Sequence, residues 1–179
     1  MPPWLRNGPA HRLFDPGFTF LLEPPTDDQL MCLNVVTTTL DPDHAELLSI
    51  TVIPVCRDQV LLSRSLQLST TALPVDRAIR QLAAFVGSRP LLGYYLEFDV
   101  AMVNKYLEPM IGIPLPNRLL DVSSLYYSYK TSRSWHAHDI DLSFKAICRE
   151  LGIPAFDPHD PLGKAAMIAL MYVRLSHGG

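Results

Sequence analysis

The sequence has no hydrophobic run long enough to cross a membrane. Its longest uninterrupted apolar stretch covers residues 165–173, about half of the roughly 20 residues that a membrane-spanning helix needs. The first residues, Met1-Pro2-Pro3-Trp4, also lack the basic and then apolar segments of a secretory signal peptide. We therefore expect a cytoplasmic protein that has no membrane partner.

Cysteine is scarce, and an excess of positive charge is missing altogether. The three cysteines, Cys32, Cys56 and Cys148, form no closely spaced pair and have apolar neighbours, so we expect them to be buried and reduced. Lys and Arg number 15 against 18 Asp and Glu, which gives a net charge of −3. Tight non-specific binding to nucleic acid is disfavoured, because such binding depends on neutralising phosphates.

Proline is concentrated at the start of the chain. Residues 1–29 contain six prolines among isolated apolar residues such as Trp4 and Phe18. This composition predicts an arm, with one short helix at most, that lies over the rest of the protein. The whole chain has 179 residues, of which 48% are hydrophobic, enough for one core. We expect that core within a single domain formed by residues 30–179.

The pattern of apolar residues beyond position 30 predicts an α/β fold. Three successive apolar runs indicate an antiparallel meander of strands over residues 31–36, 47–55 and 60–68. Further on, two short strands are expected at 90–93 and 118–121, helices at 74–87, 98–111, from 123 onward, 142–151 and 161–176, and a mobile polar loop at 129–138. Right-handed crossovers then give a five-stranded mixed sheet, the first three strands antiparallel, flanked by helices.

Three local segments resemble the motifs of one family and occur in its order. The first is Asn34-Val35-Val36-Thr37-Thr38 at the end of a predicted strand, and the others cover residues 93–99 and 159–165. Through them, residues 30–176 resemble the DnaQ-like (DEDDh) 3′–5′ exonucleases, the family of the proofreading epsilon subunit of bacterial DNA polymerase III. The resemblance implies the ribonuclease H-like fold and an active site for nucleic-acid hydrolysis.

In that family, four carboxylates hold two divalent metal ions and a histidine acts as the general base. The resemblance places the metal-ligand positions at Asn34, Val36, Asp99 and Lys164, and the general base at His159. Asp99 and His159 alone keep the family's residue type. A helix-start role for Asp99 and a surface position for His159 stay open. The charges of Asp99 and Lys164 cancel, so we expect no metal cofactor.

Neighbouring polar residues have simpler interpretations than catalysis. Asp41 and Asp43 belong to a predicted turn between strands. Asp160 precedes Lys164 by four residues, a spacing that predicts an ion pair on one helix face. Glu97 lies at a predicted helix start, where negative charge is stabilising.

Two pairs of residues are candidates for nucleic-acid binding. Tyr94 and Tyr95 stand where the family has a polar pair, and they either fill the core or stack on bases. Thr37 and Thr38 complete the first segment. The connection over residues 68–74 is shorter than in the family, which argues against family-like contacts with a substrate.

The sequence therefore predicts an exonuclease-like protein with a degenerate active site and a binding or scaffolding function. Its candidate partners are single-stranded nucleic acid, a nucleotide or another protein. One alternative is an active, divergent 3′–5′ exonuclease on single-stranded DNA or RNA, which would combine Asp99, His159 and borrowed carboxylates with Mg²⁺ or Mn²⁺. A third hypothesis is that the domain only assembles, with itself or with a partner, through the arm.

Overall fold

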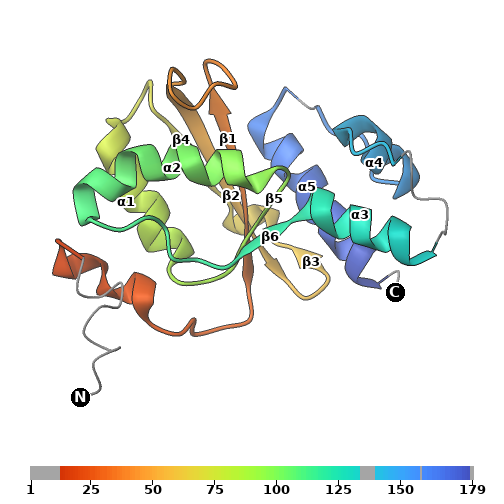
Figure 1. The fold of residues 1–179 in the computed structure, drawn as a ribbon, viewed down its shortest axis with the longest axis horizontal. Coiled ribbons are helices and arrows are strands. Elements are labelled where there is room, and N and C mark those ends of the chain that lie inside the picture. The colour runs from red at the N-terminus through yellow and green to blue at the C-terminus, as the bar shows by residue number, and fades with distance from the viewer. Residues whose placement is uncertain (1–12, 134–139, 158, 178–179) are drawn as a thin grey trace.

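A mixed β-sheet separates two groups of helices (Figure 1). The computed structural model describes residues 13–133, 140–157 and 159–177. Within them the strands are β1 (Leu30–Thr37), β2 (Leu47–Cys56), β3 (Gln59–Val60), β4 (Leu66–Ser69), β5 (Leu91–Gly93) and β6 (Leu119–Asp121). The helices are the 3₁₀ turns η3 (Pro16–Leu22) and η4 (Leu62–Arg64), then α1 (Val75–Val86), α2 (Leu96–Ile111), α3 (Val122–Arg133), α4 (Phe144–Glu150) and α5 (Pro161–His177).

The sheet has the mixed topology expected from the sequence. Its strand order is β3-β2-β1-β5-β6, and β4 also pairs with β2. The pairings of β2 with β1, β3 and β4 are antiparallel, whereas β5 is parallel to both β1 and β6. The predicted fold class is therefore confirmed.

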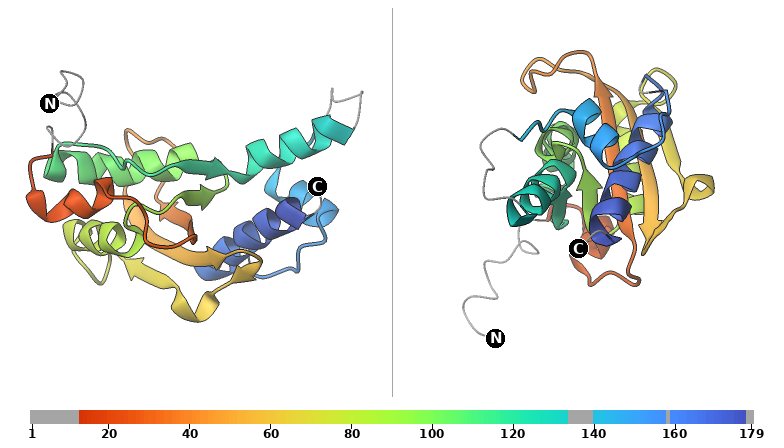
Figure 2. Two further views of the ribbon diagram at one scale, coloured as in Figure 1. Left: turned by 90° about the horizontal axis from the view of Figure 1, so that it is seen from below. Right: turned by 90° about the vertical axis from the view of Figure 1, so that its right-hand side faces the viewer.

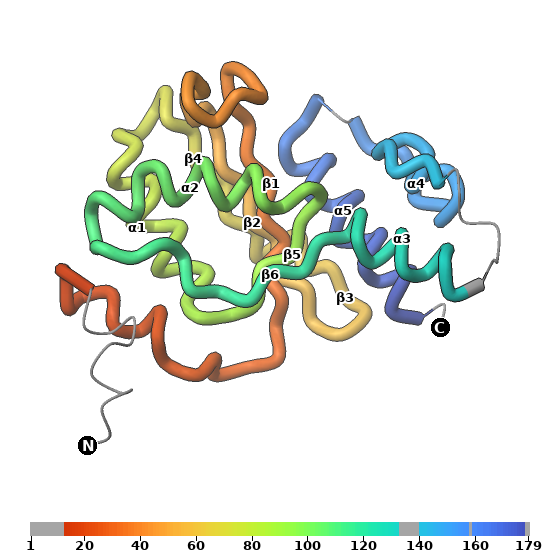
Figure 3. The backbone as a smooth tube through the Cα atoms, in the orientation of Figure 1, coloured from red at the N-terminus to blue at the C-terminus, as the bar shows by residue number. Residues whose placement is uncertain are grey.

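Each face of the sheet has its own hydrophobic core. Helices α1 and α2 cover one face, and α3, α4 and α5 cover the other, a division that the left view of Figure 2 also shows. Side chains alternate along β1, so Leu33 and Val35 enter the α1–α2 core while Cys32 enters the α5 core. Figure 3 shows that α2 and α3 begin near one another, beyond β5 and β6, and run in opposite directions.

The predicted third strand, residues 60–68, is divided into β3 and β4 by the turn η4. Pro54 of β2 explains the division. Its carbonyl oxygen accepts the backbone N–H of Leu61, so this side of Pro54 faces the third strand. Proline has no N–H to donate there, and pairing stops between Val52 and Val55. The described sheet consequently has six strands instead of five.

Most predicted helix boundaries lie within a few residues of those observed. The exception is the mobile polar loop predicted for residues 129–138, because α3 continues through Arg133. Hydroxyl groups in its last turns, those of Thr131 and Ser132, donate to the carbonyls of Tyr127 and Tyr129. The first part of that loop prediction was wrong, and residues 134–139 lie outside the described residues.

The described part of the N-terminal segment is packed against the domain. Phe18 and Leu21 of η3 are buried in the α1–α2 core. Arg80 of α1 lies over the Phe18 ring, 5.3 Å from its centroid, and forms an ion pair with Asp15. Farther along, the Arg89 guanidinium contacts both carboxylate oxygens of Asp27 at 2.8 Å.

The cysteines and the helices give two further results. Cys32, Cys56 and Cys148 are free thiols, but Cys56 at the end of β2 is only half-buried, contrary to the expectation that all three are buried. No helix in the described residues is long and apolar enough to span a membrane.

The packing of η3 leads to a test of its contribution to stability. Replacing buried Phe18 by Ala removes a large side chain from the core, and we expect a loss of about 3 kcal/mol in the free energy of unfolding. The matched control is Phe14→Ala, because Phe14 is 75% exposed and its removal should change stability little. Urea unfolding of both variants measures the difference, and equal effects would mean that η3 does not stabilise the core.

Candidate functional site

The four metal-ligand positions and the general-base position that the family resemblance assigns all line one pocket at the carboxyl end of β1. The pocket has a volume of about 620 Å³, and its lining includes Asn34, Val36, Asp99, His159 and Lys164. Segments from β1, α2 and the start of α5 therefore meet at this place. The structure brings together residues separated by as many as 130 positions in the sequence.

The α5 end of the pocket is shaped by Asp160. Its carboxylate accepts the backbone N–H groups of Leu162 and Gly163, so it caps the helix. Lys164 is half-buried and forms no ion pair with any carboxylate of the described residues. The predicted Asp160–Lys164 pair is therefore absent, because the cap occupies the carboxylate and Lys164 lines the pocket instead.

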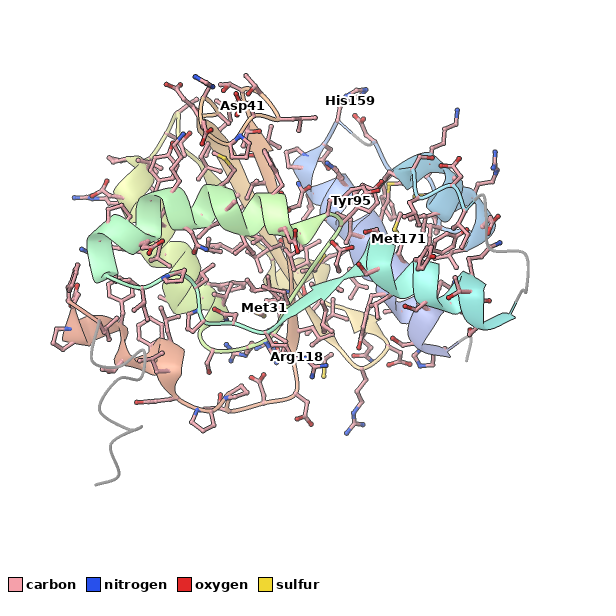
Figure 4. All side chains as sticks on the ribbon, in the orientation of Figure 1. Met31, Asp41, Tyr95, Arg118, His159 and Met171 are labelled. Carbon is pink, nitrogen blue, oxygen red and sulfur yellow. The ribbon has the colours of Figure 1, made fainter. Side chains whose placement is uncertain are left out.

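His159 lies on the turn just before α5 (Figure 4). It is exposed, and its backbone N–H donates to the Asp157 side chain at 2.9 Å. Gly163 allows this turn to pack closely on the helix, since a Cβ there would lie 2.8 Å from the Asp157 carbonyl oxygen. His159 thus combines a surface position with a place at the pocket rim.

Asp99 is the buried acid of the pocket. It lies in the first turn of α2 and is only 7% exposed. Burial raises its pKa to about 8, against the opposing effects of the Lys164 ammonium and the Val35 backbone N–H. At neutral pH the carboxyl group is therefore mostly protonated, because desolvation penalises the charged form more than Lys164 stabilises it.

Asn34 presents an unused hydrogen-bond donor. The side chain is 2% exposed, and its Nδ2 has no hydrogen-bond partner among the described residues. Leaving a buried donor unpaired costs about 1–3 kcal/mol. Asn34 is one of the residues that line the pocket, and an acceptor that reached its amide would recover this energy.

These residues do not fit a centre of two divalent metal ions. Such ions prefer several carboxylate oxygens, but the Val36 side chain offers no ligand atom and Lys164 brings a positive charge into the same pocket. Among the described residues no group of three or more His, Cys, Asp and Glu side chains is arranged to hold a metal. The remaining donors, on Asn34, Asp99 and His159, are too few and too weakly charged.

The two tyrosines of the second segment have different surroundings. The Tyr94 hydroxyl donates to the carbonyl of Leu142 at 2.8 Å, and its ring packs edge-on against Phe144, as a core-filling residue does. Tyr95 is 52% exposed and has a left-handed backbone with φ 49°, which is uncommon for a residue other than glycine. Figure 4 places it at the start of α2.

Of the two threonines and the two turn aspartates, Thr37 alone is among the described residues that line the pocket. Thr37 lines the pocket, whereas the hydroxyl of Thr38 accepts the backbone N–H of Glu46 beyond it. Asp41 and Asp43 belong to the turn between β1 and β2, where Asp41 accepts the N–H of Asp43. Lys105 fixes this turn by donating to three of its carbonyls.

A second pocket, which the sequence analysis did not identify, adjoins the first at Tyr95 and Phe98. Its volume is about 590 Å³, and it lies between the starts of α2 and α3. Asp121 anchors this junction, because its carboxylate accepts the backbone N–H groups of Leu96 and Ser124. The signal in the sequence was the acid that ends the strand at 118–121, which pairs with Gly93 at the end of β5.

Neither a protein-family profile nor a curated protein matches the sequence. Solved structures do match in three dimensions. Exonuclease I superposes with a TM-score of 0.67 and 10% identity, over 84% of this chain and 41% of that chain. The ssDNA complex of E. coli ExoI gives 0.61 and 11%, over 86% and 40%, and the RNase domain of yeast Pop2 gives 0.51 and 12%, over 83% and 76%.

The chain thus spans about two fifths of the length of exonuclease I. At these identities the likeness establishes a shared fold. That fold is the one implied by the three segments of the sequence, and it places their residues at one pocket.

The raised pKa of Asp99 predicts a pH-dependent effect of Asp99→Asn. The folded protein binds a proton up to about pH 8, whereas an unfolded Asp releases it near pH 4. The free energy of unfolding of the wild type should therefore decrease as the pH rises from about 4 to about 8. Over the same range the variant should gain a few kcal/mol relative to the wild type. Urea unfolding from pH 4 to 9 measures this gain. The control is Asp58→Asn in the exposed β2–β3 turn, and a gain independent of pH would contradict the assignment.

Proposed function

We propose that this protein is a divergent relative of the DnaQ-like exonucleases that binds single-stranded nucleic acid or its nucleotide components without hydrolysing them. The observation that carries the proposal is the presence of Lys164 and Val36 in the same pocket as Asn34 and Asp99. The pocket is lined by the residues at the positions that the family resemblance assigns to an exonuclease site. Its side chains, however, have the wrong charge for the two-metal reaction.

Electrostatics supports this reading of the pocket. Two unit charges 4 Å apart interact by about 4 kcal/mol at an effective dielectric constant near 20. The Lys164 ammonium would therefore oppose a divalent ion by several kcal/mol at similar range. Asp99 provides little compensation, since with a pKa of about 8 it is mostly neutral at pH 7.

Two features favour a nucleic-acid ligand over a purely structural role. The exposed ring of Tyr95 lies at the boundary of both pockets, and stacking of a base on an aromatic side chain is worth about 1–3 kcal/mol. The similar E. coli ExoI forms a complex with ssDNA. The shared fold and the exposed aromatic ring together support the same class of ligand here.

The first test measures metal binding by thermal unfolding. We expect millimolar Mg²⁺ or Mn²⁺ to leave the melting temperature unchanged relative to EDTA. An ion present at a concentration 100 times its Kd would add about 2.7 kcal/mol to the free energy of unfolding. This would raise the melting temperature by several degrees. A shift that disappears in Asp99→Ala but persists in Asp58→Ala would show that the pocket binds metal after all.

The second test rebuilds the missing ligands. The triple variant Asn34→Asp, Val36→Glu, Lys164→Asp restores four carboxylates around the retained His159. We expect it to gain stability from Mn²⁺ but to degrade single-stranded DNA only feebly, because a misplacement of about 1 Å costs about 10²-fold in rate. Digestion of a 3′-labelled oligonucleotide measures the rate.

The unaltered protein provides the decisive comparison in this assay. Purified free of contaminating nucleases, it should leave the oligonucleotide intact with or without Mn²⁺. If it digests the 3′ end as fast as the triple variant, the protein is an active exonuclease and the inference drawn from the pocket's charge is wrong. Loss of that activity in Asp99→Asn would then assign it to this pocket.

A further inference from the structure

We propose that the pocket holds an anion where an exonuclease holds metal ions, and that this anion is the phosphate monoester of a terminal or free nucleotide, bound by Lys164 and the side-chain amide of Asn34. The inference deepens the proposed function and rests on it. It follows from the hydrogen-bond donors that the pocket leaves unused.

Lys164 supplies the positive charge. It lies in the first turn of α5, is half-buried and lines the pocket. No carboxylate of the described residues forms an ion pair with it, and the nearby Asp160 is engaged at the helix cap. A partly desolvated ammonium that no carboxylate contacts directly attracts an anion more strongly than an exposed lysine does.

Asn34 supplies a second and independent feature. Its Nδ2 is buried, lacks a partner within the described residues and belongs to a side chain that lines the same pocket. A cation cannot accept a hydrogen bond from this group, but a phosphate oxygen can. The α5 N-terminus contributes little, because Pro161 has no N–H and the next two N–H groups donate to Asp160.

The rest of the lining is compatible with an anion. Asp99 is the single acidic residue among the described residues that line the pocket. It is only 7% exposed, so it offers little of its surface to a ligand. The neighbouring pocket is a poorer place for phosphate, since Glu97 and Asp121 both line it.

Exposed Tyr95 identifies the remainder of the ligand. Its ring borders the pocket, so a base attached to the bound phosphate has an aromatic surface within the same site. Stacking is tolerant of base identity. The ligand class is therefore a nucleotide with a monoester phosphate, without a preference for one base.

The test is isothermal titration of the full chain in EDTA with dTMP, thymidine and inorganic phosphate, and with a short thymidine oligonucleotide bearing a 3′-phosphate or a 3′-hydroxyl. We expect dTMP to bind more tightly than thymidine. Lys164→Gln should weaken dTMP binding roughly 10-fold or more, as loss of a charged hydrogen bond does. If the 3′-phosphorylated oligonucleotide binds more tightly than dTMP, a strand end is the source of the phosphate. If dTMP binds as tightly as that oligonucleotide or more tightly, the source is a free nucleotide.

The matched control is Lys145→Gln, because Lys145 is exposed on α4 and its loss should leave dTMP binding unchanged. Asn34→Asp replaces the amide by a carboxylate of the same shape and should also abolish the preference for phosphate. Melting curves verify that every variant is folded. If Asn34→Asp is unfolded, Lys164→Gln together with the preference for dTMP over thymidine decides the matter.

The outcomes separate this inference from the proposed function. If oligonucleotides bind regardless of the phosphate and of Lys164, the anion site is wrong and nucleic-acid binding stands. If inorganic phosphate binds through Lys164 but no nucleotide does, the anion site stands in part and the nucleotide assignment and the proposed function fail. If no probe binds, both are wrong.

Discussion

The alternation of side chains along β1 is the constraint on which the rest of the structure depends. The central strand pairs with β2 on one side and β5 on the other, so each residue must serve one of two cores. Leu33 and Val35 fill the α1–α2 core, and Cys32 fills the α5 core. Asn34 and Val36 share the face of Cys32. A shift of one residue in register would turn Asn34 away from Lys164 and dismantle the pocket.

The fold could be predicted because its signals are local and repeat many times. Apolar runs, turn residues and helical spacing each indicated elements that the structure contains, and the antiparallel start followed by crossovers predicted a mixed sheet. The failures occurred where individual hydrogen-bonding groups decide the outcome. Pro54 interrupts a partner strand rather than its own strand, and the hydroxyl contacts of Thr131 extend α3 into a segment whose polar composition favoured a loop.

The candidate site was predictable in position but not in electrostatic character. The three segments placed Asn34, Asp99 and Lys164 at one edge of the sheet, and the structure brings them to one pocket. The sequence did not reveal that Asp99 is desolvated, that the Asn34 amide is unpartnered or that Asp160 prefers backbone N–H groups to Lys164. Each of these properties depends on what surrounds a side chain in three dimensions. The second pocket was missed because its lining comes from two helix starts that carry no shared motif.

The division of the third strand has a consequence for the protein at high concentration. Both lateral edges of the sheet end in very short strands, of two residues in β3, four in β4 and three in β6. Another chain that docked along such an edge would form only a few main-chain hydrogen bonds before reaching η4 or the end of β6. Short edge strands are one means by which proteins avoid edge-to-edge aggregation. The same proline that breaks a regular ladder therefore helps to keep neighbouring molecules from extending the sheet.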